Sequence, residues 1–146
     1  MGEKTRSGCP VSLGLDIFGD KWTLLIIRDL MFRGKRHFRE ILESDEHISS
    51  NILADRLKLL LDEGIVTRTE NPNHKQKAIY RLTEKGIDLL PIIMQISRWS
   101  YKYRPVAQQY LADAALYQQG GAGDLGELMT ELRRAHGEEL DGRRTA

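Results

Sequence analysis

The residues best suited to recognition chemistry lie on one face of the segment ISSNILADRLKLLLDE, residues 48–63. At about 100° per residue in a helix, four leucines share one arc that suits a protein core: Leu53, Leu57, Leu60 and Leu61. The opposite face carries Asn51, Asp55, Lys58 and Asp62, with Ala54 between them. A DNA major groove about 12 Å wide admits a helix with small, hydrogen-bonding side chains. The predicted base-edge residues are Ser49, Ser50, Asn51, Ala54 and Lys58.

Phosphate contacts are predicted around this face. Ser49 is a predicted N-cap, and the amides that a helix leaves free at its N-terminus attract a phosphate. Basic residues nearby supply affinity without sequence information. The predicted phosphate and wing contacts are Lys35, Arg36, Arg56, His74, Lys75 and Lys77. Taken alone, the segment also fits an ordinary amphipathic surface helix, so the order of its neighbours decides between the two interpretations.

Cys9 is the one residue with a chemical alternative. It precedes Pro10 at the start of a predicted helix, where the helix dipole lowers the pKa of a thiol and favours oxidation or alkylation. Two hypotheses stay open: a redox or electrophile sensor, and a passive thiol buried at an interface. A single cysteine forms no internal disulfide, which favours a reducing compartment.

Other site chemistry finds little support. The four histidines, His37, His47, His74 and His136, are scattered and give no zinc spacing beside one cysteine. The stretch GGAGD, residues 120–124, lacks the strand-then-helix context of a dinucleotide loop and is interpreted as a linker. No general base is placed beside Cys9. We therefore expect no metal, no cofactor and no enzymatic activity.

The order of predicted elements is typical of a winged helix-turn-helix. Helices are expected over 10–18, 21–32 and 37–44, and a short turn leads to the helix that starts near residue 50. IVTRTE and KAIYRLT predict a β-hairpin around the turn NPNHKQ, and this hairpin is the wing. A helix over 84–103 should kink at Pro91. A further helix is expected over 106–119, and Leu125, Leu128 and Leu132 indicate another after the linker. The fold class is mostly α with a small β-hairpin.

Length and charge limit the range of functions. A chain of 146 residues fits one domain with an appended arm. Net charge is only +1, but residues 21–85 hold 13 Lys and Arg against 10 Asp and Glu, whereas residues 106–146 hold 4 against 7. The basic part suits nucleic acid and the acidic tail a different role. No stretch has signal-peptide or membrane-span character, so a cytoplasmic location is expected.

The segment 84–103 is apolar on more than one side. One small domain cannot cover so much apolar surface, which predicts a partner, most simply a second copy. The expected interface residues are Ile92, Ile93, Ile96, Trp99 and Tyr103. Two copies would set equivalent helices about 34 Å apart, one DNA turn, and so predict a symmetric operator.

Residues 9–105 resemble the HxlR-type winged helix-turn-helix regulators of prokaryotes. The resemblance rests on CPVSLGLDIFGDKWTLLIIRDL, FREIL, ISSNILADRL, LLLDEGIVTR, IYRLTEKGIDLLPII and RWSYKYRP, which occur in family order. Asp20 replaces the second glycine usual before the Lys-Trp pair, and the basic residue common near Asn51 is absent.

The resemblance implies a cytosolic homodimeric transcription factor, a repressor or an activator, on a pseudo-palindromic site. It implies that the helix starting near residue 50 enters the major groove and that helices from both chain ends form the dimer, which adds Val11 and Leu15 to the expected interface. Some members of the family sense oxidants or electrophiles through the cysteine at the position of Cys9. The predicted organisation is a flexible N-terminus over 1–8, the winged domain over 9–105 and a helical extension of unknown role over 106–146. We expect a repressor; the alternatives are a Cys9 sensor and a winged-helix protein-interaction module without DNA binding.

Overall fold

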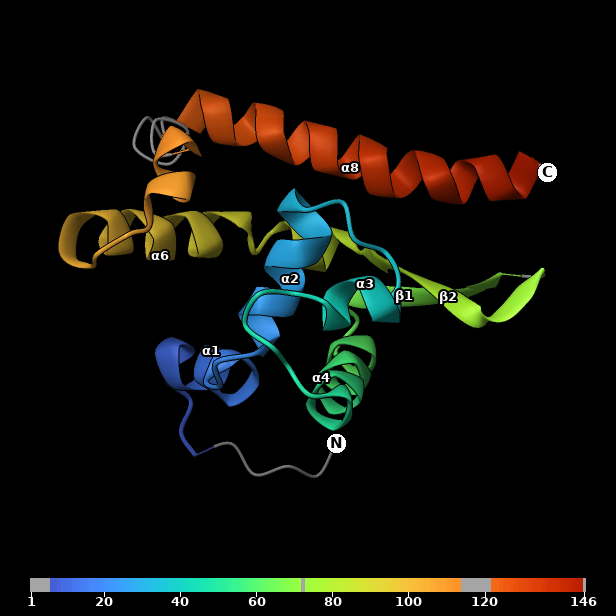
Figure 1. Ribbon diagram of the computed structural model, residues 1–146, viewed down its shortest axis with the longest axis horizontal. Coiled ribbons are helices and arrows are strands. Elements are labelled where there is room, and N and C mark those ends of the chain that lie inside the picture. Colours follow the sequence, from blue (N-terminus) through green and yellow to red (C-terminus); the bar gives the residue numbers. More distant parts are fainter. Residues whose placement is uncertain (1–5, 72, 114–121, 146) are drawn as a thin grey trace. The chain divides into compact units, whose positions relative to one another are not determined.

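The computed structural model describes residues 6–71, 73–113 and 122–145 of the chain (Figure 1). The chain divides into two compact units, Met1–Arg81 and Leu82–Ala146. The first contains α1 (Pro10–Phe18), α2 (Thr23–Phe32), α3 (Phe38–Leu42), α4 (Ser50–Asp62), β1 (Val66–Asn71) and β2 (His74–Leu82), whose last residue opens the second unit. The second contains α5 (Glu84–Ile87), α6 (Leu90–Tyr103), the 3-10 helix η1 (Gln108–Asp113) and α8 (Ala122–Thr145).

Local signals set the ends of the helices in the first unit. The Asp20 carboxylate accepts hydrogen bonds from the backbone N–H groups of Trp22 (2.9 Å) and Thr23 (3.0 Å) and so holds the turn before α2. It is not the expected N-cap, because α2 begins at Thr23 and its N-cap residue is Trp22. Gly34 and Gly64, which follow α2 and α4, adopt positive φ angles of 63° and 71°. These are conformations that glycine adopts without strain, so the predicted ends of both helices are confirmed.

The core of the first unit forms where helix faces with apolar spacing meet. α1 packs on α2, α3 packs on α4, and α4 packs on β1. The fully buried side chains come mainly from α2 and α4 and include Ile26, Ile27, Leu30, Leu53, Leu57 and Leu60. The helix pair α3–α4 and the hairpin that follows it confirm a winged helix-turn-helix.

The hairpin is tighter than the sequence suggested. β2 begins at His74, so His74, Lys75 and Gln76 belong to a strand and not to the expected turn. The turn is set by the Asn71 side-chain oxygen, which accepts a hydrogen bond from the Asn73 backbone N–H at 2.9 Å. Asparagine side chains stabilise turns in this way.

The predicted kinked helix over 84–103 is wrong. The structure has two helices there, α5 and α6, and Pro91 lies in the first turn of α6. A proline in the first turn loses no helical hydrogen bond, whereas one in the interior would remove a bond and clash with the preceding turn. The chain therefore starts a new helix at this point.

The C-terminal helix docks within the second unit. The buried imidazole of His136 accepts a hydrogen bond at Nδ1 from the Leu82 backbone N–H (3.0 Å), and Arg133 Nε donates to Glu84 Oε1 (2.6 Å). Helix α8 contacts both α5 and α6. Because α8 starts at Ala122, residues 122–124 of the predicted linker are helical. Residues 108–113 form a 3-10 helix where an α-helix was expected, and residues 114–121 lie outside the described part.

A buried carboxylate joins α2 to the segments that follow it. Asp29 is 1% exposed, and its Oδ1 accepts hydrogen bonds from Arg28 Nε (3.1 Å) and Nη2 (2.8 Å). Its Oδ2 accepts from the Ser44 hydroxyl, which in turn accepts from Lys35 Nζ at 2.7 Å. The Arg28 guanidinium also forms a bidentate pair with Glu46 at 2.8 and 2.9 Å. The turn after α2 and the end of α3 are thus held to one charged centre.

Glu46 should make stability depend on pH in the acid range. Its hydrogen bonds from Arg28 lower its pKa from 4.5 to about 2, so the stabilisation is complete above pH 4.5 and is lost as pH falls through 2. Glu46→Gln should lower the free energy of unfolding at pH 7 by about 1 kcal/mol or less, because solvent screens the partly exposed pair. Urea denaturation from pH 7 to pH 2 should show the difference shrinking towards zero. Glu43→Gln, at an exposed glutamate three residues earlier, serves as the control; a difference independent of pH would contradict this account.

Candidate nucleic-acid interface

The N-terminus of α4 is capped by a side chain and exposed to solvent. Ser49 has extended backbone angles (φ −75°, ψ 155°), and its hydroxyl oxygen accepts a hydrogen bond from the Ile52 backbone N–H at 3.2 Å. The predicted N-cap is therefore confirmed. The residue two positions earlier, His47, has a positive φ of 59°, which redirects the chain into the helix. The first turn of α4 carries no acidic residue that would repel an anion.

The two faces of α4 separate as the leucine spacing predicts. Leu53, Leu57 and Leu60 are at most 2% exposed, and Leu61 is half-buried. The residues exposed on the other side are Ser50, Asn51, Ile52, Ala54, Asp55, Lys58 and Asp62. The N-terminal half of this exposed surface thus consists of small or hydrogen-bonding side chains with one isoleucine.

Two of the predicted phosphate contacts are instead internal. Arg36 Nη1 donates hydrogen bonds to the backbone oxygens of Leu30 (3.0 Å) and Lys35 (2.8 Å). Lys35 Nζ donates to Ser44 and lies 3.6 Å from Asp29 Oδ2. Both side chains complete the turn after α2, because buried carbonyl and carboxylate oxygens need donors. Both side chains thus have structural partners that compete with the expected DNA contacts.

Arg56 is also engaged within the protein. Its guanidinium lies 3.7 Å from Asp20 and 3.2 Å from Asp55, so it links the turn before α2 to the exposed face of α4. These ion pairs compete with the expected phosphate contact of Arg56. Lys58 and Lys77 are exposed, on α4 and β2. His74 and Lys75 lie at the start of β2, and their side chains are outside the described part.

The expected dimer residues are mostly exposed apolar side chains. Val11 and Leu15 on α1 are 69% and 51% exposed. On α6, the exposed fractions are 45% for Ile92, 49% for Ile96, 58% for Trp99 and 60% for Tyr103. Ile93 is the exception: at 7% exposure it belongs to the core, because it lies about 100° around the helix from Ile92. Its assignment to an interface is corrected.

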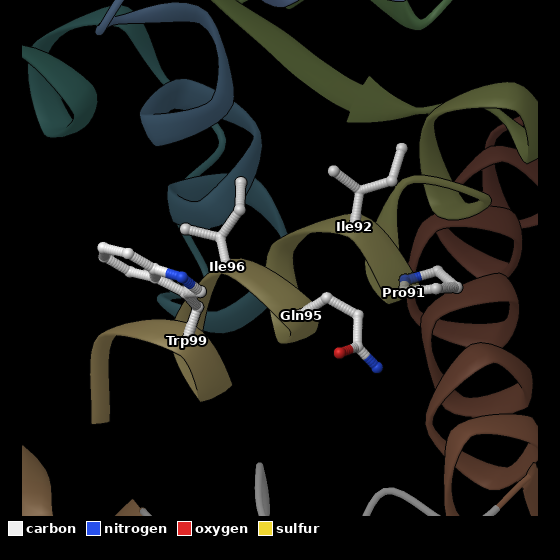
Figure 2. A pocket seen from close by; sticks show the side chains of 5 residues that line it. All are labelled: Pro91, Ile92, Gln95, Ile96 and Trp99. Carbon is white, nitrogen blue, oxygen red and sulfur yellow. The ribbon is translucent and has the colours of Figure 1, made fainter. Parts of the chain in front are cut away.

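Helix α6 presents these side chains as one group. Figure 2 shows Ile92 and Ile96 projecting from the same side of the helix, with Trp99 beside them and Gln95 pointing away. The rings of Trp99 and Tyr103 lie 5.3 Å apart between centroids. Ile92, Ile96 and Trp99 line a shallow, almost entirely apolar hollow together with Pro91 and Gln95. We call Ile92, Ile96, Trp99 and Tyr103 the α6 patch.

Cys9 lies at the N-cap position of α1 with its side chain exposed. Hydrogen bonds from the backbone N–H groups of Ser12 and, more weakly, Val11 lower the pKa of the thiol below its ordinary value. The helix N-terminus thus favours the thiolate in the direction that the sequence indicated. The thiol is exposed in the single chain, where the passive alternative expects burial against a partner.

Sequence reasoning missed several buried polar residues, among them Asp29 and His136. From the sequence, Asp29 counted only as one charged residue of a helix. The basic residues at 28, 33 and 35 could have indicated that this carboxylate forms ion pairs. His136 was treated as scattered, and only its place among the leucines of the last helix hinted at burial. Among the described residues, no group of three His, Cys, Asp or Glu side chains is placed to hold a metal ion. No helix in the described ranges is long and apolar enough to cross a membrane.

The family model and the similar known proteins indicate the same family. Residues 17–108 match the model of the HxlR-like helix-turn-helix family. The HTH-type transcriptional regulator YybR of Bacillus subtilis is 32% identical over 114 residues, which cover 78% of this chain and 90% of YybR. YodB of the same organism, also an HTH-type transcriptional regulator, is 38% identical over 96 residues, which cover 65% and 85% of the two chains.

Solved structures extend this similarity to the fold. The redox regulator HypR in its oxidized form is 35% identical with a TM-score of 0.58, over 67% of this chain and all of HypR. Reduced YodB is 35% identical with a TM-score of 0.55, over 66% and 95% of the two chains. The capped helix α4, the wing behind it and these similarities agree: the chain belongs to the HxlR family of winged helix-turn-helix transcriptional regulators.

Proposed function

We propose that this regulator binds a specific duplex DNA site as a cytoplasmic homodimer and represses transcription there. The observation that carries the proposal is the exposed N-terminal half of α4, which presents small hydrogen-bonding side chains beside a capped helix end. Such a surface fits a major groove and can bond to base edges. Repression is the simplest output, because a dimer that overlaps a promoter blocks polymerase by occupancy alone.

In this proposal α4 reads the bases and the wing holds the backbone. The base-edge residues are Ser49, Ser50, Asn51, Ala54 and Lys58, and the free amides in the first turn of α4 face a phosphate. On the wing, Lys77 is exposed, and His74 and Lys75 on the same strand complete the set of phosphate contacts. With Lys35 and Arg36 used internally, Lys58 and the wing carry more of the electrostatic attraction.

The α6 patch and the apolar side chains of α1 support a homodimer. Exposed apolar side chains grouped on one helix face, as in the α6 patch, mark a partner surface, and a symmetric partner buries the same residues from both copies. Two copies of α4 then lie about one DNA turn apart and read a pseudo-palindromic operator. The dimer is a requirement of the proposal, since one small helix makes too few base contacts for a unique site.

DNA binding should show the salt dependence of phosphate neutralisation. If the dimer neutralises about 6 to 10 phosphates, log affinity should fall with log salt at a slope of about −5 to −9. Lys77→Ala should weaken binding to all sequences alike and reduce the magnitude of the slope by about 1 per wing. Electrophoretic mobility shifts over a salt series, on duplexes selected from a random pool, measure both quantities. Lys85→Ala on α5 is the control with the same charge change.

A salt-independent response, or no selected duplex at all, would contradict DNA binding. That result would favour the alternative in which the winged domain recognises a protein.

Dimerisation should depend on the α6 patch. Ile96→Asp places a charge where the partner's apolar side chains would cover it, and the dimer dissociation constant should rise by at least about tenfold. Light scattering after size exclusion reports the mass, and operator affinity should fall in parallel. Thr130→Asp is the matched control, because it introduces the same charge at an exposed residue of α8 that does not line the hollow (Figure 2). Equal masses for the two variants would exclude this surface.

A redox response through Cys9 is a second candidate function. Its support is the exposed thiol with a lowered pKa, together with HypR, which is described as a redox regulator, and YodB, whose solved forms include quinone-bound and diamide-treated protein. With diamide, the thiolates of two chains would form one S–S bond while diamide takes up two electrons and two protons to become the hydrazine. With a quinone, the thiolate sulfur would add to a ring carbon and leave a hydroquinone.

Treatment with diamide should change operator affinity by about tenfold in the wild type, which is a typical allosteric coupling. Cys9→Ser should bind the operator equally before and after treatment. Fluorescence anisotropy measures the affinity, and non-reducing electrophoresis shows whether chains become linked. Because Cys9 is the only cysteine, a wild-type response that survives in Cys9→Ser would come from another residue and would end the sensor proposal. An unchanged wild-type affinity would end it as well.

A further inference from the structure

Asp55 occupies the centre of the exposed face of α4. The buried residues Leu53, Leu57 and Leu60 define the inward direction, and at about 100° per residue Asp55 points almost opposite to it. Its side chain is 68% exposed. A helix that enters the major groove with this face forward therefore brings a carboxylate to the bases.

Arg56 holds this carboxylate in place. Arg56 Nη2 lies 3.2 Å from Asp55 Oδ2, and Nη1 lies 3.7 Å from Asp20 Oδ1, in the turn before α2. Arg56 thus lies between Asp20 and Asp55. Its ion pair with Asp55 is made at Oδ2, so Oδ1 is the oxygen that a ligand would contact.

In the major groove, a carboxylate can form hydrogen bonds only with donor groups. It accepts and cannot donate, and the phosphates on both sides repel it. Guanine presents two acceptors, thymine an acceptor and a methyl group, and adenine a donor next to an acceptor. Cytosine alone presents an amino group without an adjacent acceptor on its major-groove edge. The chemistry of Asp55 therefore selects cytosine.

We infer that Asp55 is a specificity-determining residue that requires a cytosine in each operator half-site; the inference rests on the proposed DNA binding through α4. Asn51 provides the register. Asn51 and Asp55 are four residues apart, so their side chains leave the helix about 6 Å apart along its axis, close to two base-pair steps of about 3.4 Å. Asn51 pairs best with adenine. The cytosine should lie about two base pairs from the position that Asn51 reads.

The test compares Asp55→Asn with wild type by selection of random duplexes, followed by affinity measurements on point variants of the selected site. Wild type should prefer cytosine at one position per half-site by about tenfold. Asp55→Asn should lose that preference and should bind unrelated DNA more tightly, because it removes a charge that the phosphates repel. Asn51→Ala should relax a different position, about two base pairs away by the rise of the helix.

Asp62→Asn is the matched control. It makes the same charge change on the same exposed face, two turns nearer the C-terminus of α4 and beyond the small-residue half. It should leave every base preference unchanged. Circular dichroism of each variant establishes that the fold is retained, as the exposure of both aspartates predicts.

The outcomes separate this inference from the proposed function. Loss of the cytosine preference in Asp55→Asn alone supports the role of Asp55. Selected sites without cytosine, or an Asp55→Asn variant with wild-type preferences, would overturn the inference and leave DNA binding intact. A wild-type protein that selects no duplex would overturn both.

Discussion

The buried carboxylate of Asp29 is the interaction on which the geometry of the recognition unit depends. It accepts hydrogen bonds from Arg28 on its own helix and from Ser44 beyond α3, and Lys35 reaches it across the turn between them. Leaving such a group without donors would cost several kcal/mol of stability, commonly about 3–5 when one member of a buried pair is removed. Because Ser44 and Glu46 precede α4 by only a few residues, the same centre fixes where the chain enters that helix.

This arrangement explains why so few basic side chains remain for a ligand. A DNA-binding surface needs cations, but a buried carboxylate and the open carbonyls after α2 need them too, and Lys35 and Arg36 are used there. Arg56 is divided between two aspartates. The exposed face of α4 consequently has mixed charge, with Lys58 between Asp55 and Asp62. Recognition by such a face depends on matched hydrogen bonds more than on attraction to phosphate.

The sequence correctly predicted the features that are determined by residues close together in the chain. Glycine at positive φ after α2 and α4, Ser49 as a cap and the leucine spacing of α4 all act within a few residues, and each is confirmed. Predictions that depended on how the elements pack and where one helix gives way to the next fared less well. Arg36 bonds to Leu30, Ile93 turned inward, and Pro91 begins a helix, since nothing near 91 reveals that Leu89 already ends a turn. The base, phosphate and dimer contacts involve molecules outside the chain, and no pattern within one sequence fixes their geometry.

The hydrogen bond from Leu82 to His136 has a consequence for the chemistry of the imidazole. A peptide N–H can only donate, so Nδ1 must present its lone pair, and the neutral ring carries its hydrogen on Nε2. Few side chains can replace His136 as a hydrogen-bond acceptor at this buried position. The side-chain oxygen of asparagine lies at the distance from the backbone most similar to that of Nδ1. A chain shortened before α8 would lose this acceptor, and the backbone N–H of Leu82 at the end of β2 would need water or another group in its place.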